Sequence, residues 1–262
     1  MDIQFIRLYF FLGILLALML FEVLFPRRDL HYSRKTRWTN NLSLIFLNSA
    51  IIRFVLPITL AGIALFTEER KIGAFNLFSG YTVIKTVLSI IILDLAIYWQ
   101  HVLFHKIPLF WLIHRMHHTD LDIDVTSGLR FHPIEIIIST IIKVVVIVIF
   151  GMPVLSVIIF EILLNATSMF NHSNIFILLN IDRYLRLFIV TPDMHRVHHS
   201  IFREETNSNF GFNLACWDRV FKTYHAQPKV GHLKMNIGLE TFRDIKYLNL
   251  PWLLIIPFIK GR

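Results

Sequence analysis

The sequence predicts an all-α, multi-pass transmembrane protein with about four spans, or three spans plus a hairpin. A cytosolic helical cap is expected to carry a histidine-rich site for two metal ions. Hydrophobic residues make up 55% of the 262 positions, more than the core of a water-soluble domain needs. They gather in long runs, as in membrane spans. Ten of the 13 histidines cluster between positions 94 and 200.

Three apolar runs in the first 99 residues predict three spans. Residues 3–25 form the first run, and Pro-Arg-Arg follows it in place of a small-residue cleavage site. We therefore expect a membrane helix here and not a signal peptide. Residues 42–66 form the second span, interrupted by Arg53 and Pro57, and residues 81–99 form the third.

The loops between these runs predict the orientation. Residues 26–40 carry five Lys or Arg side chains, whereas residues 67–80 carry two. Basic loops favour the cytoplasmic side of a membrane. The third span then returns to the cytoplasmic side, close to His101.

A helical hairpin is expected next. Residues 134–150 are apolar, Gly-Met-Pro interrupts them, and residues 154–164 are apolar again. A hairpin returns the chain to the side where it began, so all ten clustered histidines share the cytoplasmic side. One integral membrane domain, 1–262, is predicted: N-terminal spans in 1–93, a histidine-rich region in 94–225 and an interfacial tail in 226–262, with a short anchor at 250–259.

Charge and cysteine content exclude several classes of protein. The net charge is +8, but the basic residues flank apolar runs, which favours anionic lipid headgroups over nucleic acid as the partner. The single cysteine, Cys216, excludes an internal disulfide, a cysteine-ligated iron–sulfur cluster and a CxxC redox pair.

The histidine spacing predicts a metal site. His101 and His105 are four residues apart, so on a helix they face the same way. Two HxxHH triplets can each present three imidazoles to one volume. The ten predicted ligands are His101, His105, His114, His117, His118, His132, His172, His195, His198 and His199.

Neutral imidazole is the most common metal ligand, and ten are too many for one ion. Two ions with about five ligands each would leave open positions. Both zinc and iron accept imidazole, but zinc prefers four ligands and no HExxH motif is present. Four carboxylates are candidates to orient the imidazoles through their second ring nitrogen: Asp94, Glu135, Asp193 and Asp218.

Two rival interpretations remain open at this point. One is a non-catalytic histidine-rich metal-binding protein or metal transporter, although transporters place ionisable residues near the bilayer midplane and these histidines follow span ends. The other is a zinc hydrolase, which the number of ligands disfavours. His31, His225 and His232 are expected to be solvated or interfacial.

The motifs resemble the fatty acid hydroxylase / sterol desaturase superfamily of membrane-bound non-haem di-iron oxygenases. The matching elements are the HxxxH, both HxxHH triplets, Arg-Phe-His-Pro-Ile-Glu at 130–135, Asn171-His172, Asn209-x-Gly211, and Trp-Asp-Arg at 217–219 with Thr223-Tyr224. The resemblance covers residues 94–224 and adds Asn171 and Asn209 to the residues expected around the ligands.

The resemblance implies an O2-dependent oxidoreductase with two iron ions, for which zinc can substitute in preparations. It would hydroxylate or desaturate a C–H bond of a membrane lipid, such as a sterol or fatty-acyl chain. The sequence has no GxGxxG, P-loop or CxxCH motif. An external electron donor is therefore expected, such as a reductase, a ferredoxin or a b-type cytochrome.

Overall fold

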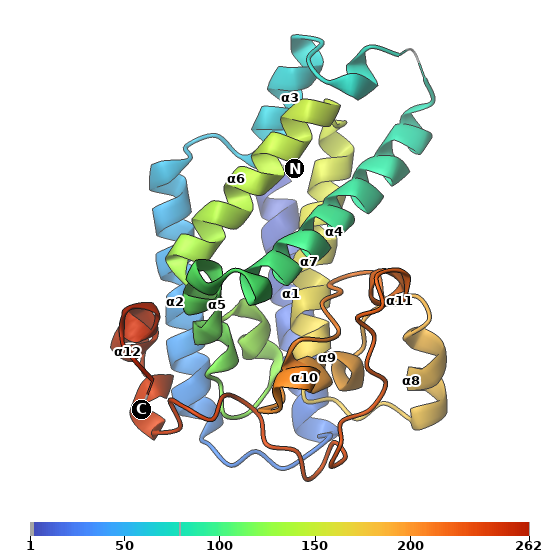
Figure 1. Ribbon diagram of the computed structural model, residues 1–262. Helices are drawn as coiled ribbons and strands as arrows, with labels where there is room; N and C mark the ends of the chain where they lie inside the picture. Colours follow the sequence, from blue (N-terminus) through green and yellow to red (C-terminus); the bar gives the residue numbers. More distant parts are fainter. Residues whose placement is uncertain (1–2, 79, 262) are drawn as a thin grey trace.

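Long helices form a bundle at one end of the molecule, and short helices form a cap at the other (Figure 1). The structure is a computed structural model that describes residues 3–78 and 80–261. In this part of the chain, helices alternate with loops and only isolated β-bridges occur. The long helices are α1 (Ile3–Leu24), α2 (Arg34–Val55), α3 (Leu60–Glu69), α4 (Thr82–Lys106), α6 (Pro133–Phe150) and α7 (Val154–His172).

Five segments are long and apolar enough to cross a membrane. They are Phe5–Leu24, Arg34–Glu69, Thr82–Lys106, Pro133–Phe150 and Val154–His172. The predicted architecture of three spans and a hairpin is confirmed: α2 and α3 make one broken segment, and α6 and α7 make the hairpin. The break falls at Pro57, which has no amide hydrogen to donate, and Thr59 Oγ1 accepts from Gly62 N at 3.0 Å to begin α3.

The third predicted span is longer in the structure, where it is α4, than the sequence predicts. The apolar run suggested an end at Trp99, but α4 continues through Lys106. His101 and His105 therefore lie in its last two turns and not beyond its end. The next helix, α5 (Pro108–His118), begins with a proline in its first turn, where a missing amide costs nothing.

The hairpin turn packs tightly against the loop after α3. Gly151 ends α6 in the left-handed conformation with φ 61°, and Gly73 of the opposing loop has φ 93°. A β-carbon on Gly73 would lie 2.1 Å from Gly151 N. Both the backbone angle and the close approach require glycine here.

The cap consists of short elements joined by ordered loops. They are η2 (Val125–Leu129), α8 (Leu179–Leu185), α9 (Pro192–His198), α10 (Arg203–Thr206), α11 (Cys216–Val220), η3 (Ile245–Leu248), α12 (Leu250–Ile255) and η4 (Ile256–Phe258). Leu253 and Ile256 of the C-terminal segment are buried against Leu44 of α2 and Met116 of α5. The predicted anchor at 250–259 therefore packs on the bundle, although Phe258 is exposed.

Candidate metal centre

Four helices that are far apart in the sequence bring the histidines together. The last turns of α4 carry His101 and His105, α5 carries the first HxxHH triplet, and α7 ends at His172. Helix α9 carries His195 and His198, and its C-cap residue is His199. The N-terminal turn of α9 is fixed by Thr191, whose hydroxyl accepts from Met194 N.

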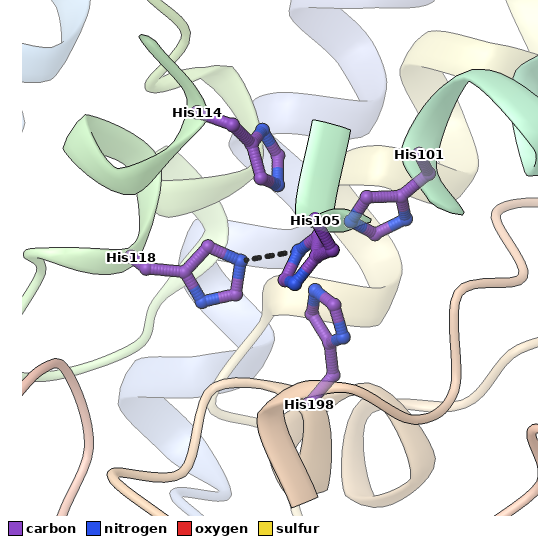
Figure 2. Close-up of side chains that lie close together, drawn as sticks. All are labelled: His101, His105, His114, His118 and His198. Atoms are coloured by element: carbon purple, nitrogen blue, oxygen red, sulfur yellow. Dashed lines mark hydrogen bonds between the residues drawn. The ribbon is translucent and has the colours of Figure 1, made fainter. Parts of the chain in front are cut away.

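Nine of the ten predicted ligands fall into two adjacent groups. The first contains His101, His105, His114, His118 and His198, and the second contains His117, His172, His195 and His199. Within each group, one ring nitrogen per residue lies within 4.8 Å of all the others. Figure 2 shows the five rings of the first group directed toward a common centre.

The distances between the ring nitrogens are explained better by shared binding of a metal ion than by hydrogen bonds between the rings. In the second group, Nε2 of His172 lies 3.1, 3.0 and 3.2 Å from Nε2 of His117, His195 and His199, respectively. One ring nitrogen cannot donate a hydrogen to three others. Roughly 3 Å is the separation of two nitrogens bound to one ion at about 2.1 Å.

The first group also contains ring nitrogens whose position is explained by a metal ion. Nε2 of His101, His114 and His198 is buried without a hydrogen-bond partner. A buried, unsatisfied polar atom costs about 1–3 kcal/mol, so three in one place require a ligand that accepts their lone pairs. A metal ion meets this requirement.

Backbone carbonyls orient four of the nine rings. Four Nδ1–H groups donate to carbonyl oxygens, from His101 to Phe210 (2.9 Å), His117 to Arg130 (3.1 Å), His172 to Ser168 (2.7 Å) and His198 to Ser208 (2.7 Å). Because Nδ1 carries the hydrogen, Nε2 is the free electron-pair donor that faces the centre. The sequence predicted carboxylates in this role and gave no signal for the carbonyls.

Glu135 does contact a predicted ligand directly. Its carboxylate accepts from His114 Nδ1 at 2.7 Å, and both side chains are buried. Glu135 lies in the first turn of α6, so the hairpin helix that crosses the bundle also orients one imidazole. A carboxylate in this position makes the imidazole a stronger ligand.

The other residues expected to orient imidazoles bind backbone groups, neutral side chains or cations. Asp94 accepts from Leu214 N and from Trp217 Nε1, the latter at 2.8 Å. Asp218 accepts from Phe210 N at 2.7 Å, and the Phe210 carbonyl in turn holds His101. These carboxylates therefore act on the centre through the loop at 209–217.

The remaining three expected residues also bind groups other than the grouped imidazoles: Asn171, Asn209 and Asp193. Asn171 donates to Phe212 O, and Asn209 donates to Met194 O at 2.9 Å. Asp193 pairs with Arg27 and Arg196. Burial alone would raise the pKa of Asp193, but the two guanidinium groups lower it to about 2.

His132 lies outside both groups. It is the N-cap of α6, where its Nδ1 accepts from Ile134 N, and its Nε2 lies 3.2 Å from Leu254 O. The ring is thus used to begin α6 beside the C-terminal segment. We leave it out of the ligand set proposed below, because neither ring nitrogen faces the other histidines.

Burial keeps several of the grouped histidines neutral. It lowers the pKa of His117, His118, His195 and His199 well below the ordinary value, and neighbouring imidazoles lower it further. Burial also lowers the pKa of His198, to about 3. Imidazole binds metal in its neutral form, so these rings are ready to act as ligands at neutral pH.

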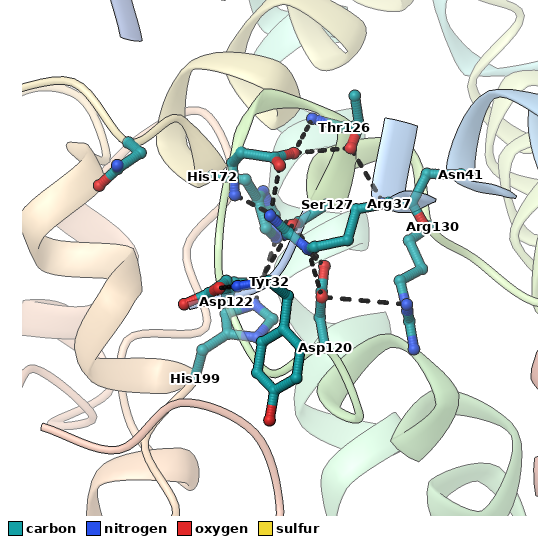
Figure 3. A network of polar contacts seen from close by, with 12 residues as sticks. Tyr32, Arg37, Asn41, Asp120, Asp122, Thr126, Ser127, Arg130, His172 and His199 are labelled. Atoms are coloured by element: carbon teal, nitrogen blue, oxygen red, sulfur yellow. Dashed lines mark hydrogen bonds and ion pairs between the residues drawn. The ribbon is translucent and has the colours of Figure 1, made fainter. Parts of the chain in front are cut away.

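A buried ionic network supports the loop after the first HxxHH triplet (Figure 3). Arg37 of α2 donates to Asp120 at 2.8 and 3.0 Å and also pairs with Asp124. Arg130 donates to Met116 O at 3.2 Å, within α5, and its own carbonyl holds His117. This network was not among the sequence-based predictions, although the Asp-x-Asp-x-Asp motif at 120–124, just after the HxxHH triplet, is a signal for it.

The comparisons with known proteins agree with this geometry. The family model described as "Fatty acid hydroxylase" matches residues 86–223, more than half of the chain. This chain belongs to the fatty acid hydroxylase family. The resemblance found in the sequence motifs is thereby confirmed, and the matched range contains all nine grouped histidines.

Lipid-modifying enzymes are among the relatives of this family member. It is 28% identical to ornithine lipid hydroxylase OlsE of Rhizobium tropici over 55% of this chain and 43% of the relative. It is 27% identical to alkylglycerol monooxygenase of Homo sapiens (58% and 33%) and 29% identical to that of Xenopus tropicalis (61% and 34%). The chain thus spans less than half the length of these relatives. No solved structure matches the chain.

The family match does not include every residue that supports the centre. Arg37 and Arg27 lie before residue 86, in and beside the N-terminal helices, yet they pair with Asp120 and Asp193 of the matched region. The first helices of this fatty acid hydroxylase family member therefore help to position the cap as well as cross the membrane.

Proposed function

We propose that this protein is an integral membrane oxidoreductase that uses O2 to oxidise a C–H bond of a membrane lipid at a pair of histidine-bound iron ions. The observation that carries the proposal is the pair of adjacent all-histidine groups with inward-facing, unpartnered nitrogens. Membership of the fatty acid hydroxylase family and similarity to two kinds of lipid-oxidising enzyme support it.

Nine histidines would hold the two ions, five around one and four around the other. Iron bound there would supply the change of oxidation state that O2 activation and C–H cleavage require. Zinc also binds imidazole and would occupy the same groups in some preparations. The nitrogen-only ligand set differs from the Glu-x-x-His sets of soluble di-iron bundles.

The residues of the chain orient the ligands and exclude water. Carbonyl oxygens and Glu135 hold the Nδ1 sides of five rings, and eight of the nine rings are buried. His105 is the half-buried exception. The Trp111 ring lies 4.9 Å from that of His105 and 5.4 Å from that of His118, so we expect the lipid chain to approach the five-histidine group beside Trp111.

Hydroxylation is the first outcome to look for. The relatives named above are a hydroxylase and a monooxygenase, and both names describe the insertion of oxygen. Desaturation would follow the same removal of hydrogen without that insertion. A polar membrane lipid is the substrate class that these relatives suggest.

Electrons would come from a separate protein, because the chain has no nucleotide-binding or haem-attachment motif. A reductase, a ferredoxin or a b-type cytochrome would serve. The basic loop at 26–40 and the net charge of +8 would attract an acidic donor to the cytoplasmic side.

The test combines metal analysis with lipid analysis. We expect about two iron ions per chain in protein purified without chelator, and an oxygenated lipid in cells that express it. His118→Ala should lose both, whereas His31→Ala, at an exposed position outside the groups, should lose neither. Metal without any lipid change, under good expression with iron and O2, would instead favour a metal-binding protein.

A further inference from the structure

Helix α8 buries its charged side chains and exposes its apolar side chains, which is the reverse of a helix that faces water. Asp182 and Arg186 are buried and paired with each other, and Arg186 also donates to Ala226 O at 2.9 Å. The outward side is apolar, and each of its large residues is at least 50% exposed: Leu178, Leu179, Ile181, Tyr184, Leu187 and Phe188. A helix on the surface of a water-soluble protein buries its apolar side and exposes its polar side.

This apolar side continues from a membrane-spanning helix. Phe176 N donates to Phe25 O at 2.8 Å, and Pro26 pairs with Ile175 in an antiparallel bridge. At the end of α1, Leu24 and Phe25 are 57% and 56% exposed, as expected for side chains in lipid. The exposed apolar surface of α1 thus runs through Phe176, which is 44% exposed, onto α8. Helix α8 lies at the edge of the cap (Figure 1).

Cationic side chains accompany this surface. The Arg27 guanidinium lies 5.6 Å from the centre of the Phe176 ring, and Arg183 of α8 is exposed. Arginine beside aromatic and aliphatic side chains is typical of helices that lie between lipid headgroups and acyl chains. A soluble protein partner would not require continuity with a spanning helix.

We propose that α8 lies in the membrane interface, with its outward residues among the acyl chains and Arg183 among the headgroups. The bilayer surface then covers one edge of the cap as well as the helical bundle. This inference concerns how the protein sits in the lipid, so it does not depend on the oxidation chemistry proposed above.

The location of α8 would also set the depth of the metal centre. The chain passes from α8 to α9 in a few residues, and Val190 N donates to Asn213 O at 3.1 Å on the way. Anchoring α8 in one leaflet would therefore hold α9 and its histidines at a constant distance from the acyl chains.

Spin labels in proteoliposomes test the proposal. Single cysteines would replace Leu179, Tyr184 and Phe188 in a Cys216→Ser background, in vesicles of phosphatidylcholine and phosphatidylglycerol. Leu16 of α1, 64% exposed, is the matched lipid control, and Glu204, exposed on α10, is the matched water control. Power saturation would compare collisions with oxygen and with a water-soluble nickel complex.

We expect the three α8 labels to collide more with oxygen than with nickel, as at Leu16, and Glu204 to show the reverse. Nickel accessibility like that of Glu204 at all three sites would overturn the proposal. Immobile spectra with dipolar broadening would also overturn it, because they would show that a second copy covers this surface. All three positions are exposed, so we expect the substitutions to leave the fold intact. Elution of each variant as a single species would verify this.

Discussion

At the scale of single residues, the centre depends on which nitrogen of each imidazole carries its hydrogen. Five of the nine rings donate Nδ1–H to a carbonyl or to Glu135, and this leaves Nε2 free for a metal. A ring that carried its hydrogen on Nε2 would present this hydrogen to the ion and would not bind the ion. Small changes around these acceptors should therefore alter metal binding strongly.

Removing the Glu135 carboxylate should weaken metal binding. Glu135→Ala leaves His114 Nδ1 without its partner at 2.7 Å, and losses of about 10–100-fold in affinity follow such changes. Glu135→Gln keeps an acceptor and should fall between. Retention of iron against a graded chelator would measure this, with Glu204→Ala as the exposed control; equal retention in all variants would contradict it.

The metal-free protein should lose stability in acid. Burial lowers the pKa of His198 to about 3, whereas in the unfolded chain it titrates near about 6.5. Between these values the unfolded state binds more protons, so stability decreases as pH falls from about 6.5 toward about 3. Melting temperatures of chelator-treated protein in detergent would show this decrease; a constant melting temperature from pH 7 to pH 4 would refute it.

At the scale of elements, the cap is attached to the bundle by close backbone approach and by buried ion pairs. The η2 turn packs on α7 near His172, and α2 supplies Arg37 to the loop that joins α5 to α6. These contacts explain why helices without a ligand still matter to the centre.

Gly128→Ala should separate η2 from α7. A β-carbon at this position would lie 2.3 Å from Ser168 O, the carbonyl that holds His172. We expect a loss of about 1–3 kcal/mol in stability and reduced metal in the four-histidine group. Thermal unfolding and metal per chain would report both, and Gly13→Ala, with open space around it, should change neither.

Arg37→Met, in α2, should be among the most destabilising single changes at the boundary between the bundle and the cap. It leaves Asp124 buried without its cation and leaves Asp120 with Arg130 at 3.9 Å in place of its two close contacts to Arg37. Breaking a buried pair costs about 3–5 kcal/mol. The exposed neighbour substitution Lys35→Met should cost little. Chemical denaturation in detergent would compare the two, and similar midpoints would show that the network is not important for stability.

At the scale of the whole molecule, one end of the bundle carries the metal centre and the other carries the hairpin turn. The sides of the membrane follow from charge: five basic residues in the loop at 26–40 and two in the loop at 67–80. The chain is expected to place the centre in the cytoplasm.

Labelling of intact cells tests this orientation. In a Cys216→Ser background, a cysteine at the exposed position of Arg70 should react with a membrane-impermeant thiol reagent. A cysteine at the exposed position of Lys35 should react only after permeabilisation. The opposite pattern would place the centre outside the cytoplasm.

The sequence by itself determined the helical bundle and the nature of the site. The long apolar runs, the Pro57 break and the Gly-Met-Pro turn are local signals, and local backbone chemistry decides them. The common direction of His101 and His105 likewise follows from the period of one helix, whereas each HxxHH triplet divides between the two groups.

Only the tertiary structure decided how the ligands divide. His117 separates from its neighbours His114 and His118 and joins His172, 55 positions further along the chain. His132 begins α6 instead of facing the centre. Backbone carbonyls orient four of the rings, and Glu135 is the expected carboxylate that orients a fifth. Helix periodicity places a side chain on a face, but the packing of separate helices determines which other side chains that face meets.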